Sequence, residues 1–119
     1  MSYLQTLSIE CGDAAFSMLS GDPVFKPEHL HQHKQNGQDI HICTWENAAI
    51  PDEEYKWIRS VLLQLDEHED PDDVTYGYKM FSIGEGFNDY TAEFNPAGFG
   101  FDTCLKVVVD IPFGADIIL

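Results

Sequence analysis

The sequence predicts one α+β domain in which two or three helices cover one face of a mostly antiparallel sheet of about five strands. One reason is size, because 119 residues suffice to bury a single core. A second is composition, since 44% hydrophobic and 13% aromatic residues are untypical of disordered chains. A third is periodicity, because helical and strand patterns alternate at first and only strand patterns follow Pro71. We therefore expect the order β-α-α-β-α-β-β-β over residues 1–119.

Four elements are expected in the first half of the chain. Residues 3–10 alternate between apolar and polar side chains, as a half-exposed strand does. Residues 13–21 begin with a capping aspartate and end with glycine, which predicts a short helix. Residues 27–35 begin with proline and glutamate, which favour a first turn, and predict a second helix. Residues 38–45 alternate again and predict the next strand.

The strongest helical pattern covers residues 51–67. An apolar stripe recurs there at helical spacing, and three acidic residues occupy the first turn. Three strands separated by hairpin-length turns are expected to follow, over residues 74–83, 89–94 and 99–111. In the last two of these strands, the alternation predicts an apolar face toward the core and an acidic face, with Glu93 and Asp102, toward solvent.

Charge is the most unusual property of this sequence. Aspartate and glutamate number 21 against six lysines and arginines, which gives a net charge of -15. Residues 1–50 carry six acids and two bases, a net of -4, and residues 51–119 carry fifteen acids and four bases, a net of -11. So much negative charge disfavours direct binding to nucleic acid or to an anionic membrane. We expect the partner to be a basic protein surface.

Six carboxylates fall within eight residues that contain no lysine or arginine: Asp66, Glu67, Glu69, Asp70, Asp72 and Asp73. Neighbouring side chains on a helix, or alternate ones on a strand, lie about 5 to 7 Å apart, near the spacing of phosphates along a nucleic-acid strand. We predict that this run, with Glu93 and Asp102, presents a DNA-like array to the partner. Asp52, Glu53 and Glu54 contribute to the array, although they also suit a helix start. The plainer alternative is a solvated acidic face that aids solubility.

In size and composition the chain is similar to phage-encoded inhibitors of the anti-CRISPR and antirestriction types, and to immunity proteins that block nuclease toxins. This similarity implies a non-enzymatic inhibitor of a nucleic-acid-acting machine, or an antitoxin for one cognate toxin. It rests on no shared motif and assigns no residues.

Two further patterns concern the cellular compartment. The N-terminus shows no signal-peptide pattern and no apolar run is long enough to cross a bilayer, so we expect a cytoplasmic protein. Cys11, Cys43 and Cys104 form no Cys-x-x-Cys pair, which predicts buried, reduced thiols without a catalytic role.

Four histidines raise the alternative of a small metal-binding enzyme: His29, His31, His33 and His41. His29 and His33 share a face if the segment is helical, and all three of the closely spaced histidines share one face if it is a strand. The glutamate of a metalloprotease motif is absent, so we predict surface histidines and no metal or cofactor. The acidic run does not fit a calcium loop either, because Pro71 and Gly77 stand where such a loop needs glycine and glutamate.

Overall fold

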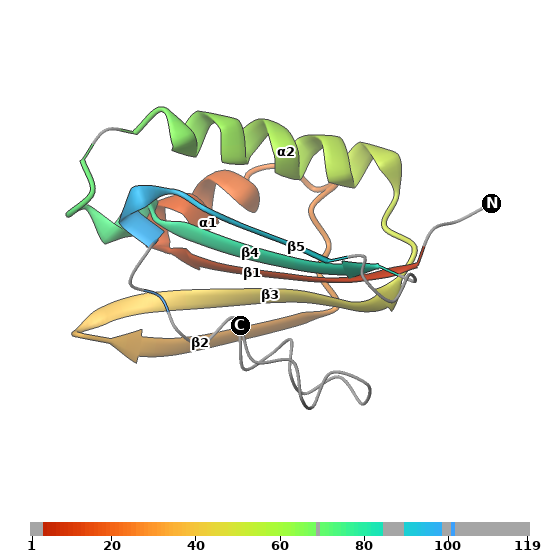
Figure 1. Cartoon of the computed structure of the whole chain (residues 1–119), viewed down its shortest axis with the longest axis horizontal. Helices are drawn as coiled ribbons and strands as arrows, with labels where there is room; N and C mark the ends of the chain where they lie inside the picture. Colours follow the sequence, from red (N-terminus) through yellow and green to blue (C-terminus); the bar gives the residue numbers. More distant parts are fainter. Residues whose placement is uncertain (1–3, 69, 85–89, 99–100, 102–119) are drawn as a thin grey trace.

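The structure, a computed structural model, describes residues 4–68, 70–84, 90–98 and 101. Within these ranges five strands form one antiparallel sheet, and two α-helices lie on one of its faces (Figure 1), which confirms the predicted α+β class. In chain order the elements are β1 (Gln5–Gly12), α1 (Asp13–Leu19), β2 (His29–Gln35), β3 (Gln38–Ala48), α2 (Asp52–Asp66), the 3-10 turn η1 (Val74–Tyr76), β4 (Tyr78–Gly84), β5 (Tyr90–Phe94) and the 3-10 turn η2 (Pro96–Gly98).

Strand β1 is the centre of the sheet, whose strand order is β2-β3-β1-β4-β5. It pairs with β3 on one side and with β4 on the other, so that Ile9 lies opposite both Cys43 and Met80. Because a strand lies on each side and β1 is buried along most of its length, it fixes the position of every other element.

The main core lies between the sheet and the two helices. Its buried members are Leu7, Ile9, Cys11, Ala15, Leu19, Cys43, Trp45, Ile58, Val61, Leu62, Leu65, Tyr78 and Met80. Four of them belong to α2 and have the helical spacing that the sequence predicted. Cys11 and Cys43 are buried free thiols, as predicted, and Cys104 lies outside the described residues.

The helix predicted over residues 27–35 is wrong, because His29–Gln35 is the strand β2. Asn36 and Gly37 have positive φ angles of 54° and 81°, and they form the two-residue turn that pairs Gln35 with Gln38. Asn-Gly is the strongest short hairpin signal as well as a helix-end signal. Here the hairpin is formed, and pairing with β3 outweighs the helix-start pattern of the preceding residues.

The assignment of sheet faces is also corrected by the structure. The face away from the helices was expected to be acidic, yet in the inner strands it carries buried and mostly uncharged side chains: Thr6, Ser8, Glu10, Ile40, Ile42, Thr44, Phe81 and Ile83. In β5, Glu93 lies opposite Met80 and therefore faces the helices. Apolar residues occur on both faces of these strands, so alternation alone does not tell which face meets the helices.

Of the strand expected over 99–111, only Phe101 belongs to the described residues. Neither helix in the described part of the chain combines the length and apolar character that crossing a lipid bilayer requires.

Candidate functional site: the acidic loop after α2

Residues 66–73, which we call the acidic loop, connect the end of α2 to η1. Four of its carboxylates are exposed, namely those of Asp66, Glu67, Asp70 and Asp72, and that of Asp73 is half-buried. Glu69 lies outside the described residues. The last turn of α2 contains no basic residue. The loop therefore adds negative charge to a helix end that already carries a partial negative charge, which is electrostatically unfavourable.

The beginning of the acidic loop is held against β4 and η1. The Tyr78 hydroxyl donates a 2.6 Å hydrogen bond to Oδ1 of Asp66. The ring of His68 stacks on that of Tyr76, with ring centroids 4.1 Å apart. These contacts fix the direction in which the chain leaves α2.

The second half of the loop is organised by its own carboxylates. Oδ1 of Asp70 accepts a 3.0 Å hydrogen bond from the backbone nitrogen of Asp72. Oδ1 of Asp73 accepts hydrogen bonds from the backbone nitrogen and the hydroxyl of Thr75, and so caps η1. The other oxygen of Asp73, Oδ2, lies 3.6 Å from Nε2 of His68. The described part of the loop is therefore held at Asp66, His68, Asp70 and Asp73.

The η1 turn in turn lies against the end of β1. Gly12 donates a 3.0 Å backbone hydrogen bond to Gly77, and a Cβ atom at Gly12 would approach within 2.7 Å of the Thr75 Cα. Only glycine permits this close approach. Asp13, the residue after Gly12, begins α1 at the same end of the molecule, and its exposed carboxylate bonds to Nε2 of His41 at 2.6 Å.

Two residues of the loop make no comparable contact. Within the described part of the chain, neither the Glu67 nor the Asp72 carboxylate has a hydrogen-bond or ion-pair partner. The acidic loop thus combines carboxylates that shape it, those of Asp66, Asp70 and Asp73, with carboxylates that are free to meet another molecule.

The other residues predicted for the acidic array lie elsewhere or have other roles. Glu93 forms an ion pair with Arg59 of α2, and this hydrogen bond raises the pKa of the arginine. Asp102 lies outside the described residues. Asp52 and Glu53 are exposed at the start of α2, which for a helix of 15 residues is about 22 Å from its end.

Glu54, the third acid of that first turn, is not part of any exposed array. It is buried, with 4% of its surface exposed. Its Oε2 accepts hydrogen bonds from the Lys26 backbone nitrogen at 2.6 Å and from the Trp45 indole nitrogen at 3.0 Å. Its role is to join the loop before β2 to β3 and α2, which corrects its prediction as a contributor to partner binding.

The histidines share one face of β2, as expected for a strand. His29, His31 and His33 lie opposite Thr44, Ile42 and Ile40 of β3 in register. His33 Nε2 is 3.5 Å from the buried Glu10 carboxylate, and His29 Nε2 is 3.9 Å from that of Glu46. Among the described residues, no group of three or more histidine, cysteine or acidic side chains is arranged to hold a metal ion.

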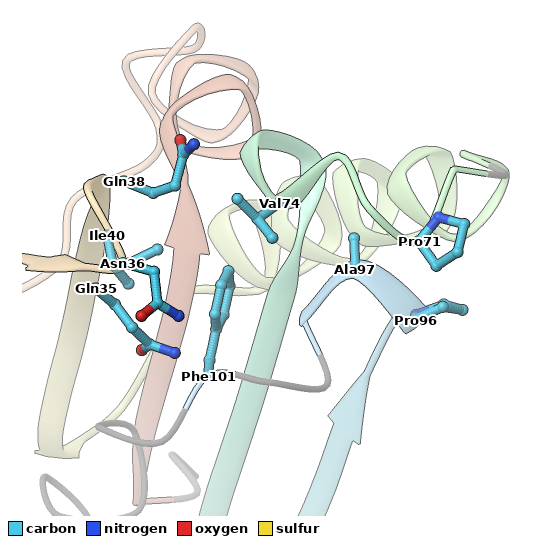
Figure 2. A pocket seen from close by; sticks show the side chains of 9 residues that line it. All are labelled: Gln35, Asn36, Gln38, Ile40, Pro71, Val74, Pro96, Ala97 and Phe101. Carbon is cyan, nitrogen blue, oxygen red and sulfur yellow. The ribbon is translucent and has the colours of Figure 1, made fainter.

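A cavity of about 290 Å³ lies next to the acidic loop (Figure 2). Its polar lining comes from the β2–β3 hairpin, including Asn36 and Gln38. Its apolar lining includes Pro71 of the loop, Val74 of η1, Ala97 of η2 and Phe101. This cavity could not be predicted from the sequence, because the hairpin and the loop are far apart in the chain. The Asn-Gly pair that forms the hairpin was the only local signal for it.

Comparison with protein-family models, with curated proteins and with solved structures gives no match to this chain.

Proposed function

We propose that this protein is a non-enzymatic inhibitor whose acidic loop binds the basic, nucleic-acid-binding surface of a partner protein, as anti-CRISPR and antirestriction proteins do. The observation that supports the proposal is the position of the loop. Its exposed carboxylates follow the C-terminus of α2, whose last turn contains no basic residue.

That position is unfavourable for the folded protein by itself. A carboxylate near a helix C-terminus costs about 0.3 to 1 kcal/mol, whereas a lysine or arginine there would stabilise the helix. Glu67, the C-cap residue of α2, has no partner within the described chain that would offset this cost. A role in binding explains why acidic residues are kept at a site where the fold favours basic ones.

The anchoring of the loop also favours binding. Tyr78, Tyr76 and Thr75 hold it through the contacts described above. A surface that is ordered before binding loses less conformational entropy when the complex forms. Opposite charges on the two proteins would also speed their encounter and make it sensitive to salt.

The test compares the wild-type protein with a loop variant, Glu67→Gln, Asp70→Asn and Asp72→Asn. Asparagine at position 70 keeps the oxygen that accepts the hydrogen bond from Asp72, so the fold should be preserved. Immobilised protein is exposed to host-cell lysate, and retained proteins are identified. We expect the wild type to retain a nucleic-acid-acting protein at low salt and to release it at high salt or when duplex DNA is added in excess.

The matched control variant is Glu46→Gln, Asp52→Asn and Glu53→Gln, which removes the same number of charges from exposed positions away from the loop. The loop variant should bind the partner about tenfold more weakly, since each exposed ion pair is worth roughly 0.5 kcal/mol. The control variant should bind like the wild type. Equal binding by both variants would contradict the proposal.

An immunity protein for one nuclease toxin is the other form of this function, because it uses the same charge complementarity. The identity of the retained protein decides between the two forms. A single basic nuclease that loses its activity on binding indicates an immunity protein, whereas a CRISPR or restriction component indicates the first form.

A further inference from the structure

We infer that the cavity beside the acidic loop receives one arginine side chain of the basic partner. This inference rests on the proposed function and adds to it a defined point of contact. It is carried by three features of the cavity: its size, the chemistry of its walls and the charge next to it.

The cavity is large enough to admit one long side chain. Its volume of about 290 Å³ lies just below the range of roughly 300 to 1,000 Å³ for small-molecule sites. Two of its lining residues are buried, Phe101 with 3% of its surface exposed and Ile40 with 1%. Pro71 and Pro96 are exposed and lie at its outer side.

The two sides of the cavity differ in polarity. Val74, Ala97 and the two prolines form an apolar side that suits the methylene groups of a long side chain. Across the cavity from these residues, the side-chain amide groups of Gln35 and Asn36 point toward Phe101 (Figure 2). Amide oxygens accept hydrogen bonds, and the planar guanidinium of arginine offers five N–H donors.

Aspartates adjoin two of the residues that line the cavity. Pro71 and Val74 line it, and the chain places Asp70, Asp72 and Asp73 beside them. Each of these residues adjoins a lining residue in the chain, so their negative charge would favour a cation in the cavity if it lies within a Debye length of about 8 Å at physiological salt.

The two lysines of the neighbouring strands are already engaged. Lys34 Nζ lies 3.1 Å from Oδ1 of Asp39, which lowers the pKa of that carboxyl group. Lys79 Nζ donates a 2.6 Å hydrogen bond to the carbonyl oxygen of Phe101, and Lys79 is opposite the buried Glu10 in register. Among the described residues, Lys34 is therefore paired with a carboxylate outside the acidic loop, and neither lysine has an ion-pair contact with a carboxylate of the loop.

The test uses N-acetyl-arginine amide as the probe and the isotope-labelled full chain as the target in an NMR titration. We expect saturable shifts in the backbone signals of Val74, Ala97 and Phe101. N-acetyl-citrulline amide, which has nearly the same shape without the charge, should cause no saturable shift. The lysine analogue should bind more weakly than the arginine probe, because it lacks the planar fork of donors.

Replacing one of two glutamines by arginine gives a test variant and a control variant of equal charge. Gln38→Arg places a guanidinium at the cavity. It should weaken binding of the probe about tenfold, because the new side chain repels the probe's like charge and fills part of the cavity. Gln32→Arg adds the same charge at an exposed position of β2 that does not line the cavity, and should leave binding unchanged. Well-dispersed spectra of both variants show that they are folded.

The inference is overturned if citrulline and arginine probes shift the same signals equally, or if shifts from the arginine probe spread along the loop without saturation and without affecting Ala97 and Phe101. Its failure differs from failure of the proposed function. A loop variant that still binds the partner contradicts the function even when the probe enters the cavity. Absence of probe binding contradicts only the cavity inference when partner binding is lost in the loop variant.

Discussion

The Tyr78 hydroxyl donates a 2.6 Å hydrogen bond to the carboxylate of Asp66, which joins β4 to the last residue of α2. The tyrosine is buried, with 3% of its surface exposed, while the aspartate is exposed. One bond therefore connects the inner sheet to the start of the acidic loop. It is the contact through which a change in the core would reach the proposed binding surface.

The first prediction concerns Tyr78→Phe. Burial, and then the adjacent Asp66 carboxylate, raise the pKa of Tyr78 above its ordinary value of about 10. As the pH rises above about 10, the unfolded chain loses this proton first, so the stabilisation from Tyr78 is complete below that pH and declines above it. In Tyr78→Phe, stability should no longer fall at high pH through this group. The substitution should lower the free energy of unfolding by about 1 kcal/mol at pH 7.

Urea unfolding between pH 7 and pH 11 measures both effects. Tyr55→Phe is the control, because it removes a phenol without removing the bond to Asp66. An alkaline loss of stability that is as steep in Tyr78→Phe as in the wild type would show that the Tyr78 phenol does not contribute to this loss.

The second prediction concerns Asn95, which has 1% of its surface exposed. Its Oδ1 accepts hydrogen bonds from the backbone nitrogens of Tyr78 and Gly98, at 3.0 and 2.9 Å. Its Nδ2 donates to the carbonyl oxygens of Tyr76 and Leu65, at 2.8 and 3.3 Å. This one side chain therefore joins α2, η1, β4 and η2.

Asn95→Ala leaves several buried backbone groups without partners, so we expect a loss of about 3 to 4 kcal/mol in the free energy of unfolding. Asn95→Asp should be at least as damaging at pH 7, because it removes both donated bonds and buries a charge facing two carbonyl oxygens. Chemical denaturation measures the loss, and a cost below about 1 kcal/mol for Asn95→Ala would exclude this role.

Elements that depend on local pattern could be predicted from the sequence, and contacts between distant segments could not. The apolar stripe of α2 is local, and it gave the helix and its buried face correctly. Asn36-Gly37 is compatible with both a helix end and a hairpin, and only the pairing of β2 with β3 decides between them. The two roles of the Asn-Gly pair explain why β2 was missed.

For the candidate site, too, local features could be predicted from the sequence and long-range contacts could not. The carboxylates of the acidic loop are adjacent in sequence, so their clustering was evident before the structure was known. The bond between Asp66 and Tyr78 spans 12 positions, and the one between Asn95 and Leu65 spans 30. No local signal indicates such bonds, and for that reason the sequence analysis did not find how the loop is anchored.

The third prediction concerns Glu54. Both hydrogen bonds that it accepts, from the Lys26 backbone and the Trp45 indole, end on the same oxygen, Oε2. Glu54→Gln can keep both bonds on its single side-chain oxygen, so we expect it to cost about 1 kcal/mol or less. Glu54→Ala leaves both donors unpaired in a buried setting and should cost about 2 to 4 kcal/mol.

Urea unfolding followed by tryptophan fluorescence measures this difference, and the emission of folded Glu54→Ala should change because the indole loses its partner. Equal stability of the two variants would mean that these bonds do not contribute to the fold. The comparison also tests whether Glu54 has a structural role that its exposed neighbours Asp52 and Glu53 in the same turn do not have.

The fourth prediction concerns the stability of the two charge variants designed to test the function. Removing carboxylates after the C-terminus of α2 relieves repulsion with the helix dipole and among the carboxylates themselves. The loop variant, Glu67→Gln, Asp70→Asn and Asp72→Asn, should therefore be more stable than the wild type by about 1 kcal/mol at low salt. The control variant loses Asp52 and Glu53 from the first turn, where acids are favourable, and should be less stable by a similar amount.

Urea unfolding at pH 7 in low and high salt measures both differences, and both should shrink in high salt because screening weakens them. Opposite signs at low salt would mean that the acidic loop weakens the fold that carries it. A loop variant that is more stable than the wild type but no longer binds the partner would show that the carboxylates which destabilise the fold are the ones needed for binding. A loop variant less stable than the wild type would show instead that the carboxylates stabilise the fold, and that their position after α2 is not unfavourable.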